Sequence, residues 1–162
     1  MVIASRYRKD VAAMPANSCM PVSSDPPHFA VSVKRDLKTD QILKRSKVFS
    51  VNWIGYNDKR IITLLSKSSK SANKLDAFDI PYQEILGAPV ISSAEAYAIC
   101  QKKSVQKVGD HDLIVASVTG VMASIDFDEN WKFEDYRPIL YLGSSFQDPF
   151  TTIQLKRRRG TA

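Results

Sequence analysis

Hydrophobic and polar residues alternate almost strictly over residues 28–34. Phe29, Val31 and Val33 fall on one face of an extended chain, and smaller or more polar residues fall on the other. A double proline at 26–27 comes directly before, and proline fixes φ and cannot donate to a strand ladder. The pattern therefore predicts a β-strand that is introduced by a rigid turn.

Comparable patterns run through most of the chain. Alternating, β-branched or aromatic stretches predict strands at 2–13 (one or two short strands), 17–22, 48–54, 94–107, 112–127 and 138–142. Helical spacing of apolar residues predicts short helices at 58–66, at 73–78 and after a Thr39-Asp40 N-cap, where Ile42 and Leu43 would form the apolar stripe. Residues 66–71 are rich in Ser and Lys and predict a mobile loop, and residues 81–89 predict irregular structure.

These elements indicate a mainly β fold with a few short helices in the middle of the chain. The two long strands near the end are joined by a short connection, which makes them antiparallel. Strands and helices do not alternate regularly, so a doubly wound parallel sheet is not favoured. A closed or partly closed barrel fits best, because it removes exposed sheet edges.

Length and composition place the chain among ordinary globular domains. We expect one domain over residues 1–162, with a basic C-terminal tail at about 154–162. No apolar run approaches the ~18 residues of a membrane helix, and the first residues lack the apolar core of a signal peptide. Cys19 and Cys100 have no metal-site spacing, so we expect a reducing, cytoplasmic location and no metal.

The formal net charge is +6, and much of it is concentrated between Lys34 and Lys47. A basic surface can bind nucleic acid, bind a phosphate group, or serve only solubility. A nucleic-acid-binding barrel would interleave aromatic residues with cations on one strand face. Here Phe29 and Phe49 alternate with small residues and are predicted to lie in the core, so nucleic acid is not favoured.

No familiar catalytic motif is present: the sequence contains no GxGxxG, GxxxxGK[ST], HExxH or GxSxG. His111 lies in a Gly-Asp-His turn, where capping by Asp110 is a sufficient role, and Cys100 is predicted to be a buried thiol. Lys38 and Thr39 lie at a predicted helix start, shortly after Lys34 and Arg35. That arrangement suits a phosphate, although solvated lysines beside a plain N-cap would give the same sequence.

Several segments occur together in an order that is similar to one known family. The segments are ANSCMPVSSDPPHFAVSV (16–33), Thr39, FSVN (49–52), SANKLDAF (71–78), VGDHDLIVASVTGV (108–121) and YRPILYLGSSF (136–146). In this order they resemble the flavin reductase-like family of FMN-binding split β-barrels. The chain departs from that family at residues 68–71, Ser-Ser-Lys-Ser, where relatives often show Gly and Arg.

The resemblance implies a homodimer that binds FMN, with FAD as the alternative, and uses NAD(P)H as a transient reductant. By motif, the residues flanking the flavin ring would be Asn17, Ser18, Cys19 and Met20. Ser23 and Ser24 would lie beside the ribityl-phosphate chain, and the residues near the phosphate would be Lys34, Arg35, Lys38 and Thr39. His111 would lie near the flavin or the nicotinamide, as the candidate catalytic residue.

The function implied is a flavin reductase that passes a hydride to FMN and electrons on to a flavin or another acceptor. Hydride transfer needs stacking and orientation more than an acid or a base, so the missing triad is no objection. The alternative is an FMN-binding electron carrier that does not itself oxidise NAD(P)H. The sequence leaves both open, along with the nicotinamide preference and the acceptor.

Overall fold

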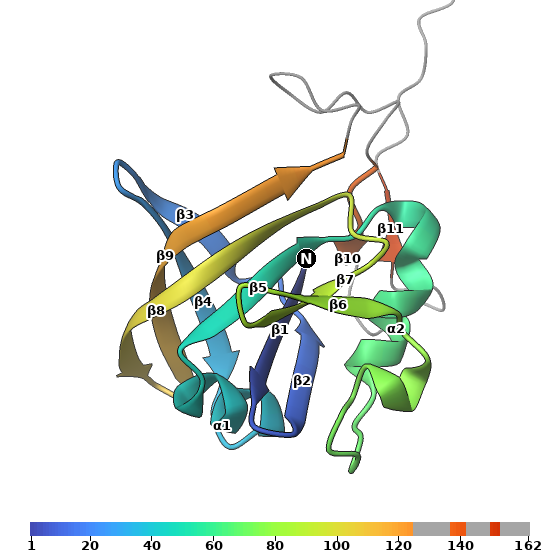
Figure 1. The fold of residues 1–162 in the computed structure, drawn as a ribbon, viewed down its shortest axis with the longest axis horizontal. Helices are drawn as coiled ribbons and strands as arrows, with labels where there is room; N and C mark the ends of the chain where they lie inside the picture. The colour runs from blue at the N-terminus through green and yellow to red at the C-terminus, as the bar shows by residue number, and fades with distance from the viewer. Residues whose placement is uncertain (125–136, 142–149, 153–162) are drawn as a thin grey trace, which may run out of the picture.

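The structure is a computed structural model, and it describes residues 1–124, 137–141 and 150–152. Its centre is a seven-stranded sheet in the order β2-β1-β5-β8-β9-β4-β3, in which every neighbouring pair is antiparallel (Figure 1). The strands are β1 (Val2–Tyr7), β2 (Asp10–Pro15), β3 (Cys19–Ser24), β4 (Pro27–Lys34), β5 (Val48–Trp53), β8 (Ala96–Val108) and β9 (His111–Ala123). The mainly β prediction is confirmed.

Two helices and two small hairpins complete the described part of the chain. Helix α1 (Lys38–Arg45) follows β4 at one end of the sheet, and α2 (Lys59–Ser66) lies to one side of it (Figure 1). The short 3₁₀ turns are η1 (Tyr56–Asp58) and η2 (Asp76–Phe78), and the small hairpins are β6 (Tyr82–Ile85) with β7 (Ala88–Ile91) and β10 (Leu140–Tyr141) with β11 (Phe150–Thr151).

The sequence prediction was wrong for residues 81–89, which form most of the β6–β7 hairpin. Its two-residue turn, Leu86-Gly87, has positive φ at both positions (50° and 81°), as tight hairpin turns require. Leucine rarely adopts positive φ, so the turn carries no clear sequence signal. The end of the strand predicted at 112–127, residue 142 of the strand predicted at 138–142, and the basic tail at 154–162 lie outside the described residues.

The main core cluster joins side chains from six strands of the sheet to Leu43 of α1. Val31 and Val33 are fully buried, which confirms the alternation seen in β4, and Phe49 is buried on β5. Cys19 and Cys100 belong to the same cluster. Burial raises the pKa of Cys19 to about 11 and that of Cys100 to about 12, so both remain thiols at neutral pH.

Asn52 on β5 ties three strands together inside the protein. Its side-chain Nδ2 donates to the carbonyl of Val2 on β1 (3.2 Å) and to the hydroxyl of Ser50 (2.8 Å). Its Oδ1 accepts from the backbone N–H of Ile91 on β7 (3.0 Å). Because Asn52 is fully buried, these bonds satisfy groups that water cannot reach.

We predict that Asn52→Ala lowers the free energy of unfolding by about 1–3 kcal/mol, because it leaves the Ile91 N–H buried without an acceptor. Urea unfolding of the variant checks this, with the exposed Asn57→Ala as the matched control. Equal unfolding midpoints for Asn52→Ala and the wild type would contradict the assignment.

Candidate functional site

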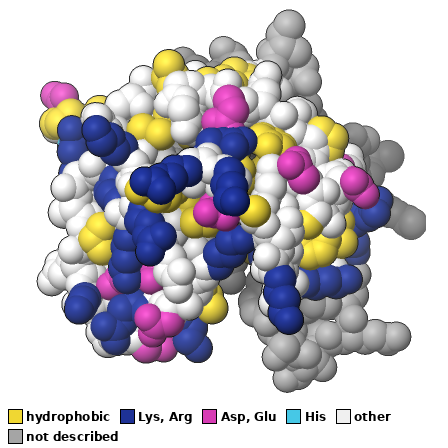
Figure 2. All heavy atoms as spheres, turned by 60° about the horizontal axis from the view of Figure 1, so that its bottom comes forward, with side chains coloured by type: hydrophobic (Ala, Val, Ile, Leu, Met, Phe, Trp, Pro, Cys, Tyr) yellow, Lys and Arg dark blue, Asp and Glu magenta, His cyan; other side chains and the backbone are white. Residues whose placement is uncertain are grey.

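A groove of about 440 Å³ opens at the α1 end of the sheet. That volume falls within the ~300–1,000 Å³ typical of small-molecule sites. Its walls come from β2, the start of α1, the end of α2 and the loop that follows α2. The lining residues are Val11, Ala12, Met14, Pro15, Leu37, Lys38, Thr39, Leu65, Ser66, Lys67, Ser68, Ser69 and Lys74. In Figure 2 this end of the molecule is turned forward, and Lys and Arg side chains gather over it.

The N-terminus of α1 contributes hydrogen-bond donors to this groove. The N-cap is Leu37, and no side chain caps the helix, so Thr39 is not the cap that the sequence predicted. The carboxylate of Asp40 instead accepts from the N–H of Asp36 (3.2 Å), outside the helix. The first N–H groups of α1 therefore have no side-chain cap.

The Thr39 side chain is buried to 7% exposure and lines the groove. Within the described part of the chain its hydroxyl has no hydrogen-bond partner. The hydroxyl oxygen is not among the atoms closed off from solvent, so it is open to a hydrogen bond with a ligand in the groove. Together with the uncapped helix end, it supplies the kind of donors that suit an anion such as phosphate.

Lysine side chains supply positive charge around the groove. Lys38 Nζ donates to the carbonyl of Ser71, which links α1 to the loop after α2. Lys74 Nζ donates to the carbonyl of Leu65 (2.7 Å), and burial lowers the pKa of this ammonium group. Lys67 is exposed at the rim. An anion in the groove would offset the cost of burying Lys74.

The loop after α2 is fixed to the sheet near Asn73. The N–H of Val11 donates to the carbonyl of Ala72 (2.8 Å), and the N–H of Lys74 donates to the carbonyl of Val11 (3.1 Å). The Asn73 side chain donates to the hydroxyl of Tyr82 (2.8 Å) and accepts from the N–H of Leu75 (3.0 Å). The groove wall that contains Lys74 is therefore built into the fold.

Sequence comparison identifies the family. The model of the flavin reductase-like domain matches residues 1–148. The chain belongs to the flavin reductase-like family. The NADH-dependent flavin reductase StyB of Pseudomonas fluorescens is 31% identical over 110 residues, which cover 68% of this chain and 62% of StyB. An uncharacterized protein of Aeropyrum pernix is 28% identical over 148 residues, covering 88% of this chain and 56% of that protein. The chain thus spans 56–62% of the length of these relatives.

Solved structures agree with this family fold. The FMN-binding protein from Thermus thermophilus with bound 1-cyclohex-2-enone has a TM-score of 0.78 at 26% identity, over 93% of this chain and 83% of that one. The styrene monooxygenase flavin reductase from Pseudomonas putida S12 has a TM-score of 0.76 at 24% identity, over 96% and 90% of the two chains. These likenesses confirm the FMN-binding split-barrel fold that the sequence indicated.

Part of the predicted flavin site lies in or beside the groove. Lys38 and Thr39 line it. Asn17 and Ser18 are exposed and lie two and three residues after Pro15, which also lines it. In the next strand the Cys19 side chain points into the core, so only its backbone could face a ligand, whereas the Met20 side chain is 58% exposed.

The structure does not bring the remaining predicted residues to this groove. Ser23 and Ser24 lie near the β3–β4 turn, and the eight residues of β4 separate that turn from the α1 end by about 23 Å. Lys34 on β4 pairs with His111 on β9, at the turn end of the β8–β9 hairpin. Arg35 donates from Nη2 to the carbonyl of Gly109 in the same hairpin (2.8 Å). The roles of these residues toward a flavin stay predictions.

His111 makes the capping contact that was the simpler interpretation of its motif. Its Nδ1 lies 2.7 Å from Oδ1 of Asp110, and this hydrogen bond is the main reason why the pKa of Asp110 is lowered. The imidazole is 40% exposed, so it remains accessible to a ligand. A structural and a functional role are both compatible with this geometry.

Sequence reasoning missed Lys67, Lys74 and the groove-lining serines Ser66, Ser68 and Ser69. The available signal was the Ser/Lys-rich composition of residues 66–71, which predicted a mobile loop. Hydroxyl and ammonium groups in one short segment also suit phosphate. Only the folded chain shows that this segment faces the start of α1.

Within the described residues, no helix has the length and apolar character needed to cross a membrane. The same part of the chain brings no group of three or more His, Cys, Asp and Glu side chains together as metal ligands.

Behind α1, Lys44 Nζ forms ion pairs with Asp40 (2.8 Å) and with Asp112 at the start of β9. Both carboxylates are almost completely buried. The hydrogen bond from Lys44 is the main reason why the pKa of Asp112 lies below its usual value of 3.8. The stabilisation is therefore fully present above that value and is lost as the pH falls through the lowered pKa.

We predict that acid weakens the wild-type protein more steeply below pH 4 than it weakens the Asp112→Asn variant. Urea midpoints measured between about pH 2 and pH 6 check this. The exposed Asp79→Asn is a matched control, since asparagine accepts the positive φ of 52° at that position. Parallel pH profiles for wild type and Asp112→Asn would contradict the prediction.

Proposed function

We propose that the chain is an NAD(P)H-dependent flavin reductase that binds FMN in the groove at the α1 end. The observation that carries the proposal is the Thr39 hydroxyl, which lines the groove beside an uncapped helix start and makes no hydrogen bond within the described residues. The family and the similarity to StyB, an NADH-dependent flavin reductase, support the same activity.

The phosphate of FMN would bind at the first turn of α1. Free N–H groups and the helix dipole favour an anion there, and Thr39 would donate one hydrogen bond. Lys38, Lys67 and Lys74 would supply charge, after Lys38 exchanges its bond to Ser71 for the phosphate. Charge-assisted bonds of this kind are about twice as strong as neutral ones.

The ring of FMN would extend along β2 past Pro15 toward Asn17 and Ser18. Cys19 would contribute backbone groups, and Met20 an exposed apolar side chain. Bound FMN would supply the ring that accepts a hydride from NAD(P)H. The chain's own contribution is to hold the reactants in register and to limit the access of water. FAD could bind through the same groups, and the preference remains open.

The alternative function is an FMN-binding electron carrier without its own NAD(P)H oxidation. The 26% identity to the FMN-binding protein of Thermus thermophilus favours this second candidate. The absorption spectrum of the purified protein, followed by NADH and NADPH consumption with added FMN, separates the two. Flavin bands without nicotinamide oxidation would support the carrier. A protein that binds no flavin would refute both.

We also propose a homodimeric, cytoplasmic protein with one domain over residues 1–162 and a basic tail. Exposed apolar side chains on the sheet, such as Met20, Val22 and Val121, support a partner surface. A monomer by light scattering at micromolar concentration, with FMN still bound, would contradict the dimer.

We predict that Thr39→Val weakens FMN binding by roughly one to two decades and leaves riboflavin binding almost unchanged. A hydrogen bond to a charged group contributes about 1.5–3 kcal/mol, and riboflavin has no phosphate. Fluorescence titration with both ligands checks this. The control is Thr63→Val on α2, whose exposed side chain donates from its hydroxyl to the carbonyl of Lys59 (3.4 Å). Equal losses for FMN and riboflavin would place Thr39 away from the phosphate.

His111 is proposed to orient the nicotinamide. We predict that His111→Ala slows flavin reduction about ten- to a hundredfold and nearly preserves FMN affinity, because misplacing a reactant by ~1 Å can cost about 10²-fold. Stopped-flow reduction by NADH or NADPH measures the rate. If His111 only stabilises the turn through its hydrogen bond with Asp110, the variant will keep its rate of flavin reduction and lose thermal stability instead.

A further inference from the structure

Four charged side chains form a compact cluster behind α1, on the side away from the groove. Lys44 contacts the carboxylates of Asp40 and Asp112, which are 1% and 0% exposed. The positive charge of Arg35 also lies close enough to lower the pKa of Asp112. Two buried anions are therefore balanced by two cations, of which Lys44 remains 37% exposed.

The four residues come from three parts of the chain whose relative positions matter for the candidate site: α1, β9 and the residues that follow β4. Asp40 and Lys44 belong to α1, and Asp40 follows Thr39 directly in the chain. Asp112 follows His111 in β9. Arg35 follows β4. Its backbone N–H donates to the backbone carbonyl of Asp110 (3.0 Å), and its guanidinium donates to the carbonyl of Gly109 (2.8 Å). The cluster thus joins the helix that carries Thr39 to the hairpin that carries His111.

The cluster is also incompletely satisfied. Oδ1 of Asp40, Oδ1 of Asp112 and Nε of Arg35 are buried without a hydrogen-bond partner. Unpaired buried polar atoms are costly, so a small shift of α1 or of the hairpin that paired Arg35 Nε with a carboxylate would be favourable. Such a shift would give the same four side chains a second arrangement, in which Arg35 Nε is paired.

We propose that Arg35, Asp40, Lys44 and Asp112 are positioning residues that couple the phosphate end of the groove to the hairpin carrying His111. A phosphate at the first turn of α1 would favour one arrangement of the cluster, and that arrangement would set the orientation of His111. By reciprocity, a ligand against His111 would strengthen phosphate binding by the same factor. This inference rests on the proposed function.

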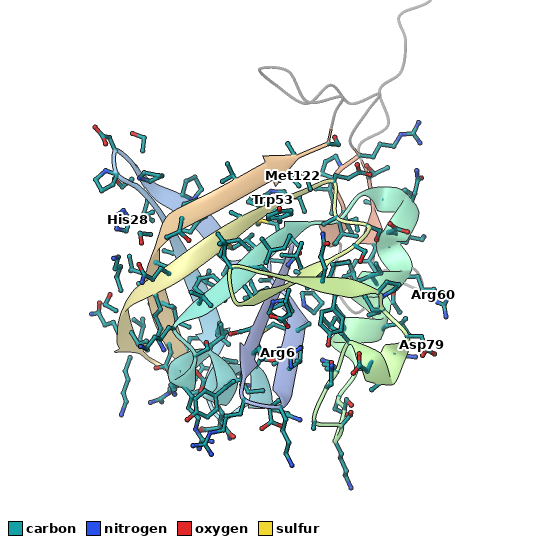
Figure 3. The ribbon with its side chains drawn as sticks, viewed as in Figure 1. Arg6, His28, Trp53, Arg60, Asp79 and Met122 are labelled. Carbon is teal, nitrogen blue, oxygen red and sulfur yellow. The ribbon has the colours of Figure 1, made fainter. Side chains whose placement is uncertain are left out.

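The two histidines of the chain make a direct test possible. His28 lies on the β3–β4 hairpin, far from α1, and serves as the internal reference (Figure 3). At fixed pH, titration with inorganic phosphate should move the ring resonances of His111 and leave those of His28 in place. The His111 response should disappear in Lys44→Met and in Asp112→Asn, and persist in the conservative Lys44→Arg. The control for loss of one surface charge is the exposed Lys47→Met.

A second measurement uses flavin affinity. Lys44→Met and Asp112→Asn should lower the ratio of FMN to riboflavin affinity about fivefold or more, the lower range of ordinary coupling between sites. Lys44→Arg and Lys47→Met should leave the ratio unchanged. A variant that merely loosened the fold would weaken both flavins equally and leave the ratio intact.

Failure of this inference differs from failure of the proposed function. If phosphate shifts the backbone resonances of Lys38 and Thr39 while wild-type His111 stays silent, the coupling is refuted and the groove assignment stands. If phosphate shifts neither, and Thr39→Val leaves FMN affinity intact, the groove assignment itself fails and the coupling fails with it. The wild-type titration decides the matter even if the variants do not fold.

Discussion

The anchoring of helix α1 is the constraint on which the candidate site depends. With eight residues the helix is too short to be stable alone, so its position comes from tertiary contacts. Ile42 and Leu43 are buried against the sheet, and Lys44 pairs with Asp112. In the same half of the helix, Lys102 Nζ donates to the carbonyl of Leu43 (2.7 Å). Groups that secure the C-terminal half of the helix thus fix where its open N-terminus points.

An N-cap with a hydroxyl or carboxylate would stabilise such a helix by about 1 kcal/mol, yet Leu37 occupies that position. Asp40, the nearby acid, is directed to Asp36 and Lys44 instead. The helix start therefore gives up local stability and keeps its donors available. This is the trade expected where binding needs preorganised groups that the fold could have satisfied internally.

The fold could be predicted largely because its signals are local. The alternation in β4 reflects burial on one face, and so do the apolar pairs in α1 and α2. The short turn between β8 and β9 indicates an antiparallel pair. The β6–β7 hairpin was not predicted, because its turn places a leucine at positive φ. The helix start at Lys38 also differed from prediction, since Asp40 accepts from the Asp36 N–H and pairs with Lys44 and does not cap the helix. Lys74 could not be found at all, because its place in the groove depends on the bridge between Val11 and Asn73.

The distribution of aromatic and cationic groups bears on what the basic surface recognises. A single-stranded nucleic acid requires aromatic faces that are open for stacking beside a cationic track. Phe49 is 1% exposed, and Phe29 packs edge-on against Trp53 with ring centroids 6.0 Å apart. Trp53 lies at the end of the sheet opposite α1 (Figure 3). The lysines, in contrast, converge on a groove of small-molecule size, where the Thr39 hydroxyl makes no hydrogen bond within the described residues. Positive charge around a groove of this size favours one compact anion over a polymer.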